Sequence, residues 1–127
     1  MDRLLLPWTT LIAIGDVNAK AFYPASGWVP ASKAALLRGT FEQRASQTNV
    51  RVVFAYQVAD SDGSPGAIYE VGTPLTADGF NYGALVDAAE NTAGKQIVRF
   101  GWLVWYNTGG AVGVSARAGG FCEFQRA

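Results

Sequence analysis

The sequence predicts an all-β domain, built as an antiparallel β-sandwich or jelly roll of about seven to eight strands. Three observations support this fold class. Apolar and polar residues alternate with a period of two in several stretches, which is the period of side chains along a strand. β-Branched and aromatic residues dominate those stretches, and turns rich in Gly, Pro and Asp separate them. No segment has the length and period of a domain-scale helix.

The size and composition of the chain favour a single domain across residues 1–127. Apolar residues make up 50% of it, which is enough to bury a core without a metal or a disulfide. Only 16% of the residues are charged, whereas soluble domains carry about a quarter, so we expect another surface to cover part of this one. The net charge is zero and the basic residues are scattered, which argues against a nucleic-acid partner.

Residues 1–35 are apolar but poorly periodic, and several prolines interrupt them. We expect them either to wrap their own sandwich as an N-terminal arm or to reach onto a neighbouring subunit. The opening MDRLLLPWTTLIAIG superficially resembles a signal peptide, but Asp2 weakens the basic start and Pro7 interrupts the apolar run. We interpret this opening as a pair of strands, with one at Thr9–Ile14. No apolar run approaches the roughly 18–20 residues that a membrane span needs, so we expect no membrane partner.

Two segments in the first half of the chain are predicted strands. Leu36–Arg44 alternates polar residues on one face with largely apolar residues on the other, which is typical of a half-buried antiparallel strand. Asn49–Val58 alternates most clearly and is rich in β-branched and aromatic residues. One of its faces carries Val50, Val52, Phe54, Tyr56 and Val58.

The middle of the chain predicts shorter elements. Brief strands are expected at Ala67–Val71 and Phe80–Val86. The turns expected around them are Asp60–Gly66, Gly72-Thr73-Pro74 and Asp78-Gly79. Single helical turns are expected within Ala31–Leu36 and Ala84–Lys95.

The longest predicted strand is Gln96–Tyr106. Both of its faces are bulky, so we expect a central strand that is covered on both sides. One face carries Val98, Phe100, Trp102, Val104 and Tyr106.

The last part of the chain is predicted to be a hairpin followed by a closing strand. A turn at Asn107–Gly110 leads to Ala111–Ala118, which we expect to pair with Gln96–Tyr106. Gly119-Gly120 then breaks or bulges the chain, and Phe121–Gln125 forms the last strand.

The sequence offers no catalytic apparatus. It has no histidine, which removes the commonest general base and metal ligand, and we expect no enzyme, no cofactor and no metal site. Cys122 is expected to be a small buried hydrophobe. Carboxylate pairs drawn from Glu42, Glu70 and Glu123 remain an alternative, although we favour ion pairs with nearby arginines. The acidic stretch Asp60–Asp62 is expected to be a plain turn, with a calcium loop as the alternative.

The aromatic residues carry the functional prediction. Four tryptophans are many for this length, and Trp102 and Trp105, three positions apart in one strand, must face opposite surfaces. Tryptophan and tyrosine anchor interfaces because they bury a large area at low entropic cost. The predicted contact residues are Trp8, Trp28, Trp105 and Tyr106.

The sequence resembles the small all-β structural proteins of tailed-bacteriophage particles. The resemblance rests on the strand Val98–Val104 with its Asn-Thr-Gly-Gly turn, and on Ala116–Phe121 leading into the last strand. It implies a capsid decoration (cement) protein, or another head or tail protein, found in the virion after assembly in the host cytoplasm. Its implied partners are further copies of itself and other virion proteins, namely the major capsid protein or tail components.

A carbohydrate-binding β-sandwich module is the alternative function. Such a module would stack sugars on exposed Trp and Tyr side chains and would hold calcium in a loop such as Asp60–Asp62.

Overall fold

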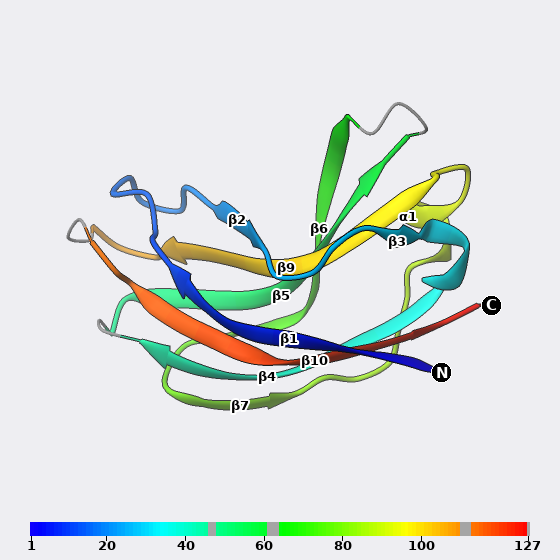
Figure 1. Ribbon diagram of the computed structural model, residues 1–127. Helices are drawn as coiled ribbons and strands as arrows, with labels where there is room; N and C mark the ends of the chain where they lie inside the picture. Colours follow the sequence, from blue (N-terminus) through cyan, green and yellow to red (C-terminus); the bar gives the residue numbers. More distant parts are fainter. Residues whose placement is uncertain (46–47, 61–63, 110–112, 127) are drawn as a thin grey trace.

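The computed structural model describes residues 1–45, 48–60, 64–109 and 113–126, and it confirms the predicted fold class (Figure 1). Ten strands in this part of the chain form two antiparallel sheets that pack face to face. We call them sheet A and sheet B. Sheet A contains β1 (Asp2–Leu11), β4 (Leu36–Ala45), β7 (Gly79–Tyr82), β8 (Val86–Asp87) and β10 (Ala116–Gln125). Sheet B contains β2 (Ala21–Pro24), β3 (Val29–Pro30), β5 (Val50–Ala59), β6 (Pro65–Leu75) and β9 (Ile97–Tyr106).

The order of the strands is that of a jelly roll. Sheet A runs β1-β10-β4-β7, with β8 also on β4, and sheet B runs β2-β9-β5-β6, with β3 also on β9. If β2 with β3 and β7 with β8 are each counted as one interrupted strand, the ten strands become eight, ordered 1-8-3-6 and 2-7-4-5. This is the order that results when one long antiparallel ribbon, with strand 1 paired to 8 and strand 4 to 5, wraps around a core.

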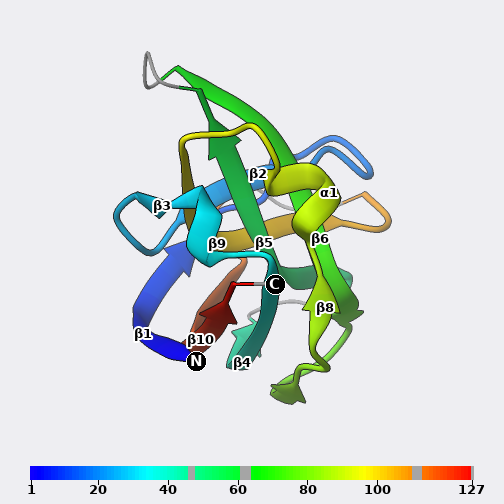
Figure 2. The same cartoon turned by 90° about the vertical axis from the view of Figure 1, so that its right-hand side faces the viewer.

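The predicted helical turns are both present as short elements. They are η1 (Ala31–Lys33), a 3₁₀ turn, and α1 (Ala89–Thr92), and they lie at the same end of the sandwich (Figure 2). The backbone N–H of Ala88 donates to the carbonyl of Ala35 at 2.7 Å, which ties α1 to the start of β4. No helix in the described part of the chain is long and apolar enough to cross a membrane.

The core lies between the two sheets and consists of the inward faces that the alternation predicts. On β9, Val98, Phe100, Trp102, Val104 and Tyr106 are all buried in this core. The ring of Trp102 packs against Phe41 of β4, with the ring centroids 4.8 Å apart. Aromatic contacts between the sheets therefore occupy the centre of the sandwich.

The predicted hairpin between the last two long strands is wrong. β9 lies in sheet B and β10 lies in sheet A, so the connection between them crosses from one sheet to the other (Figure 1). The reason is that β9 already has β2 on one edge and β5 on the other, which leaves no ladder for β10. β10 pairs instead with β1 and β4.

Three smaller expectations also change. Residues 2–11 form the single strand β1 rather than a pair of strands, and it pairs with β10. Gly119-Gly120 does not break β10, because the bulge lies on β1, where the register shifts between Leu6 and Thr9. The segment Gly72-Thr73-Pro74 lies inside β6 as an irregularity against β5, and Gly72 takes the φ of +82° that only glycine adopts easily.

Candidate interaction surface

The structure does not bring the four predicted contact residues together. Tyr106 is fully buried in the core, with its hydroxyl 2.9 Å from that of Ser115, so it offers no surface to a partner. Trp105 is only 7% exposed and has the Lys20 ammonium 4.5 Å above its ring. Trp28 is half-buried, with the Arg99 guanidinium 4.5 Å from its ring. Of the four, Trp8 alone is largely open, at 51% exposure.

The outer face of sheet B is covered by side chains of the chain itself. A second small apolar cluster, formed by Val53, Ala55, Leu103 and Trp105, lies on this face with Phe22 packed against it. Lys20 covers Trp105 and forms an ion pair with Glu70 of β6. Both rings of the predicted tryptophan sites on this side are thus shielded by cations of the same chain.

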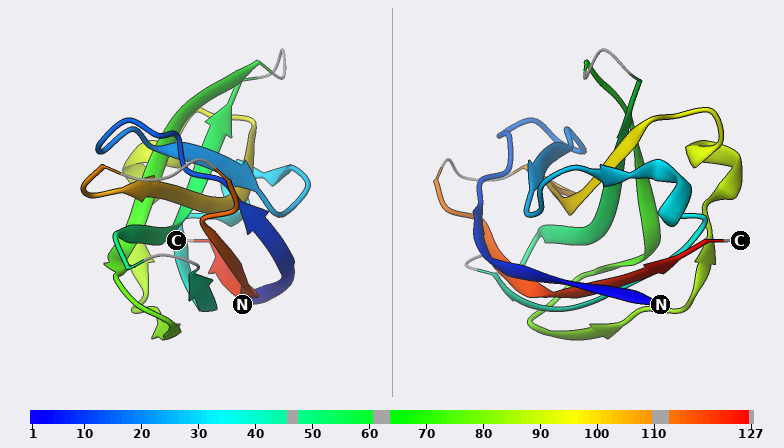
Figure 3. Two further views of the ribbon diagram at one scale, coloured as in Figure 1. Left: turned by 90° about the vertical axis from the view of Figure 1, so that its left-hand side faces the viewer. Right: turned by 45° about the vertical axis from the view of Figure 1, so that its right-hand side comes forward.

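The outer face of sheet A is different, because large apolar side chains lie open on it. The exposed fractions are 74% for Leu5, 58% for Phe80 and 80% for Tyr82, beside the 51% of Trp8. Phe121 of β10 is half-buried among them. In Figure 3 no described segment of the chain lies over this side of the sheet. We call Leu5, Trp8, Phe80, Tyr82 and Phe121 the apolar stripe.

Strand register places the apolar stripe in two neighbouring rows across sheet A. The first row is Leu5, Phe121, Thr40 and Tyr82, which are direct cross-strand partners on β1, β10, β4 and β7. In the second row, Gly119, Glu42 and Phe80 are cross-strand partners, and Trp8 lies over Gly119. The Phe80 and Tyr82 rings stack, with centroids 5.9 Å apart.

Trp8 owes its position to the bulge in β1 and to the missing side chain of Gly119. A Cβ atom at Gly119 would lie 3.0 Å from the indole Cγ and Cδ2 of Trp8, which is closer than ordinary contact. Glycine therefore leaves the space in which the indole lies against the backbone of β10. The glycine pair that suggested a break in the chain is instead the floor beneath Trp8.

Ion pairs border the apolar stripe on both sides. Above the first row, Arg38 Nε donates to Glu123 Oε1 at 2.9 Å, and Arg3 Nη2 lies 3.4 Å from Glu123 Oε2. The hydrogen bond from Arg38 lowers the pKa of the Glu123 carboxyl, and Arg3 lowers it further. Below the second row, Arg44 pairs with Glu42 at 2.5 Å and approaches Asp78 at 4.0 Å.

The carboxylates that offered an enzymatic alternative are engaged in these ion pairs. Glu42 is bound by Arg44, Glu123 by two arginines and Glu70 by Lys20. Among the described residues, no group of three or more His, Cys, Asp or Glu side chains is placed to hold a metal ion. Most of the calcium alternative at Asp60–Asp62 lies outside the described residues, and Asp60 itself lies 3.4 Å from Lys95 Nζ.

Cys122 lies on the inward face of β10. It is fully buried, and burial raises the pKa of its thiol to about 12. It therefore packs as a small apolar side chain and is not a reactive thiol.

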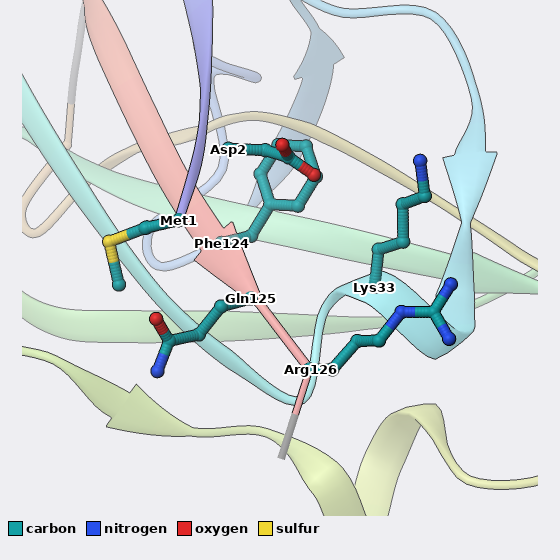
Figure 4. Close-up of a pocket in the computed structure, with 6 residues that line it drawn as sticks. All are labelled: Met1, Asp2, Lys33, Phe124, Gln125 and Arg126. Carbon is teal, nitrogen blue, oxygen red and sulfur yellow. The ribbon is translucent and has the colours of Figure 1, made fainter.

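An open depression of about 550 Å³ lies beside the ends of β1 and β10 (Figure 4). Its lining comes from both terminal segments and from Lys33 of η1. The side chains of Lys33 and Arg126 lie on one side of it, and those of Met1 and Gln125 on the other (Figure 4). Its titratable side chains are one carboxylate, Asp2, and two cations, which do not form an acid–base pair.

Sequence reasoning identified Trp8 but missed Leu5, Phe80, Tyr82 and Phe121 as surface residues. The available signal was the alternation itself. Phe80 and Tyr82 share a strand face, as do Phe121 and Glu123, and a charged residue on the same face as Phe121 indicates solvent.

Comparisons with known proteins show a fold and no family. No protein-family model matches the chain, and no curated protein matches it. A structure of the Gx strain of infectious bursal disease virus matches with a TM-score of 0.61 and 13% identity, over 95% of this chain and 30% of that one. The VP2 subviral particle of the same virus matches with a TM-score of 0.60 and 13% identity, over 95% of this chain and 30% of that one.

A third match has lower identity. It is the Gt strain of that virus, with a TM-score of 0.60 and 9% identity, over 95% of this chain and 32% of that one. The chain thus spans about a third of the length of the viral chains that it matches. At these identities the likeness establishes the jelly-roll fold.

Proposed function

We propose that this chain is a non-enzymatic structural protein of a virus particle, which acts by binding other protein surfaces. Its most specific form is a capsid decoration or cement protein that attaches to an assembled shell through the outer face of sheet A. The observation that carries the proposal is the apolar stripe, which is open to solvent across four strands of one sheet.

The size of the apolar stripe supports a binding role. Large side chains bury about 150–250 Å² each, so the exposed parts of Leu5, Trp8, Phe80 and Tyr82 amount to roughly 500 Å². That is near the upper end of the largest apolar patch on a typical monomer, about 300–600 Å². Covering it would supply on the order of 10 kcal/mol, which is comparable to the cost of association.

The fold and the chemistry of the surface agree with this role. Jelly rolls occur in viral capsid domains and in lectins, and the matched structures are described as those of a virus and its subviral particle. The charged groups beside the apolar stripe are largely paired with each other, which suits a protein surface better than a polyanion. The expected partners are further copies of this chain and a major capsid protein or tail component.

The test is the location of the protein in particles. Virus particles from the biological source of this sequence are separated by gradient sedimentation, and the chain is detected with an antibody. We expect it in the intact-particle band at a fixed ratio to the shell protein. Tyr82→Ser should reduce that ratio, while Ile68→Ser, at an exposed position on β6, should leave it unchanged. A protein that never sediments with particles would refute the proposal.

A carbohydrate-binding module is the second candidate, because one observation favours it. The exposed and stacked rings of Phe80 and Tyr82 lie with Trp8 on the same sheet face, and such rings can stack on sugars. Binding to insoluble polysaccharides, measured by depletion from solution, tests it directly. Depletion that disappears in Tyr82→Ser and persists in Ile68→Ser would favour this candidate over the virion role.

A further inference from the structure

The apolar stripe lies between two groups of charges that differ in sign. The group above the first row holds Arg3, Arg38 and Glu123 and has a net charge of one positive, from two arginines and one glutamate. The group below the second row holds Arg44, Glu42 and Asp78 and has a net charge of one negative, from one arginine and two acids. Arg117, the cross-strand partner of Arg44, is exposed beside this second group.

We propose that the apolar stripe pairs with the same stripe of a second copy of this chain, around a two-fold axis that runs across the strands of sheet A between its two rows. The proposal rests on the proposed function, because it names a partner for the same surface. The first row of one copy then packs on the second row of the other. Leu5 faces Trp8, and Tyr82 faces Phe80.

The charges favour this axis over the alternatives. With the axis across the strands, the positive group of each copy faces the negative group of the other, and Glu123 faces Arg117. An axis parallel to the strands would instead place each charged group opposite its own copy, which repels. A symmetric contact repeats each favourable pairing twice, since an isologous interface joins the same patch on both subunits.

The area and the geometry of the sheet face suit a dimer. A stable interface buries about 800 Å² per partner. The apolar stripe supplies roughly 500 Å² of this, and the bordering arginines and acids supply a polar rim. An axis across the strands also keeps the strands of the two copies nearly in line, which is the aligned packing that two sheet faces adopt at about 10 Å separation.

The first experiment measures self-association of the purified chain by analytical ultracentrifugation across a concentration series. We expect a monomer–dimer equilibrium. Phe80→Ser and Tyr82→Ser should each raise the dimer Kd at least tenfold, and the matched control Ile68→Ser should not change it. All three positions are exposed, and thermal melting confirms that each variant is folded. A wild-type chain that stays monomeric at every concentration would overturn the self-pairing, while the virion role would still be open to its own particle test.

A second experiment tests the direction of the axis by cross-linking. Arg3 and Thr10 are both exposed on β1 and lie about 20 Å apart along the strand, and the proposed axis brings Arg3 of one copy opposite Thr10 of the other. A short bismaleimide should therefore join Arg3→Cys to Thr10→Cys in a mixture of the two variants, and neither variant to itself. The native Cys122 is buried and does not compete. Cross-linking of each variant to itself, with no gain on mixing, would refute this axis.

Discussion

Gln43 is a buried side chain whose replacement should stabilise the protein. It lies on the inward face of β4, is fully buried, and neither its amide nitrogen nor its amide oxygen has a hydrogen-bond partner among the described residues. A buried polar group without a partner costs about 1–3 kcal/mol, whereas an apolar group of the same shape has no such cost. We therefore expect Gln43→Met, which keeps the length and the unbranched chain, to stabilise the fold.

The expected magnitude follows from the two unpaired amide groups. With part of the gain lost to imperfect packing, Gln43→Met should raise the free energy of unfolding by about 2 kcal/mol. For a domain of this size that corresponds to an increase in Tm of roughly 6–10 °C. Urea denaturation gives the free energy, and calorimetry gives the Tm.

Gln57 provides the matched control. It is also a buried glutamine on a long strand, but its Oε1 accepts hydrogen bonds from Arg99 at 2.9 and 2.7 Å and its Nε2 donates to the Gly66 carbonyl at 3.1 Å. Gln57→Met leaves Arg99 without this acceptor and should lower the free energy of unfolding by about 2 kcal/mol. The reasoning is refuted if Gln43→Met destabilises the protein as much as Gln57→Met does, because Gln43 would then have a partner.

Three further predictions concern sheet A. Gly119→Ala should cost about 1–3 kcal/mol of stability, because its methyl group meets the Trp8 indole, and in a Trp8→Ala background the cost should disappear; denaturant titration of the four proteins checks both. Cys122 should react with a thiol reagent only at the rate of unfolding, since burial raises its pKa to about 12; fast labelling of the native protein would contradict its burial. The lowered pKa of Glu123 means that the folded chain binds fewer protons than the unfolded chain, so this contribution to stability is present above the ordinary pKa of 4.5 and is lost as the pH falls below it. Glu123→Gln should flatten that part of the stability–pH curve, and an unchanged slope would show that the ion pairs do not form in solution.

The local parts of the fold could be predicted from the sequence because the alternation of side chains is a local property. The period of two located the long strands and divided β4, β5 and β9 into their correct faces. The same division placed Tyr106 with Trp102 on one face, and the buried Trp102 shows that this face is the core. Our selection of Tyr106 as a contact residue neglected that pattern.

The pairing of strands depended on contacts between distant parts of the chain. Nothing in β9 or β10 states that β2 and β5 fill both edges of β9, and so the adjacent segments were mistaken for a hairpin. The alternation of Phe80 and Tyr82 likewise defined a face but not its environment. That face is solvent-exposed because β7 pairs with β4, whose opposite face packs on sheet B.

The sequence by itself determined the all-β class, the positions of the long strands and the lack of histidine chemistry. These depend on residue types and on the geometry of a single extended strand. The tertiary structure alone decided the jelly-roll order, the covering of Trp28 and Trp105 by cations, and the open stripe across sheet A. The physical reason is that a strand has two faces and two edges, and only the pairing of strands that are distant in the sequence decides which of them remain in contact with water.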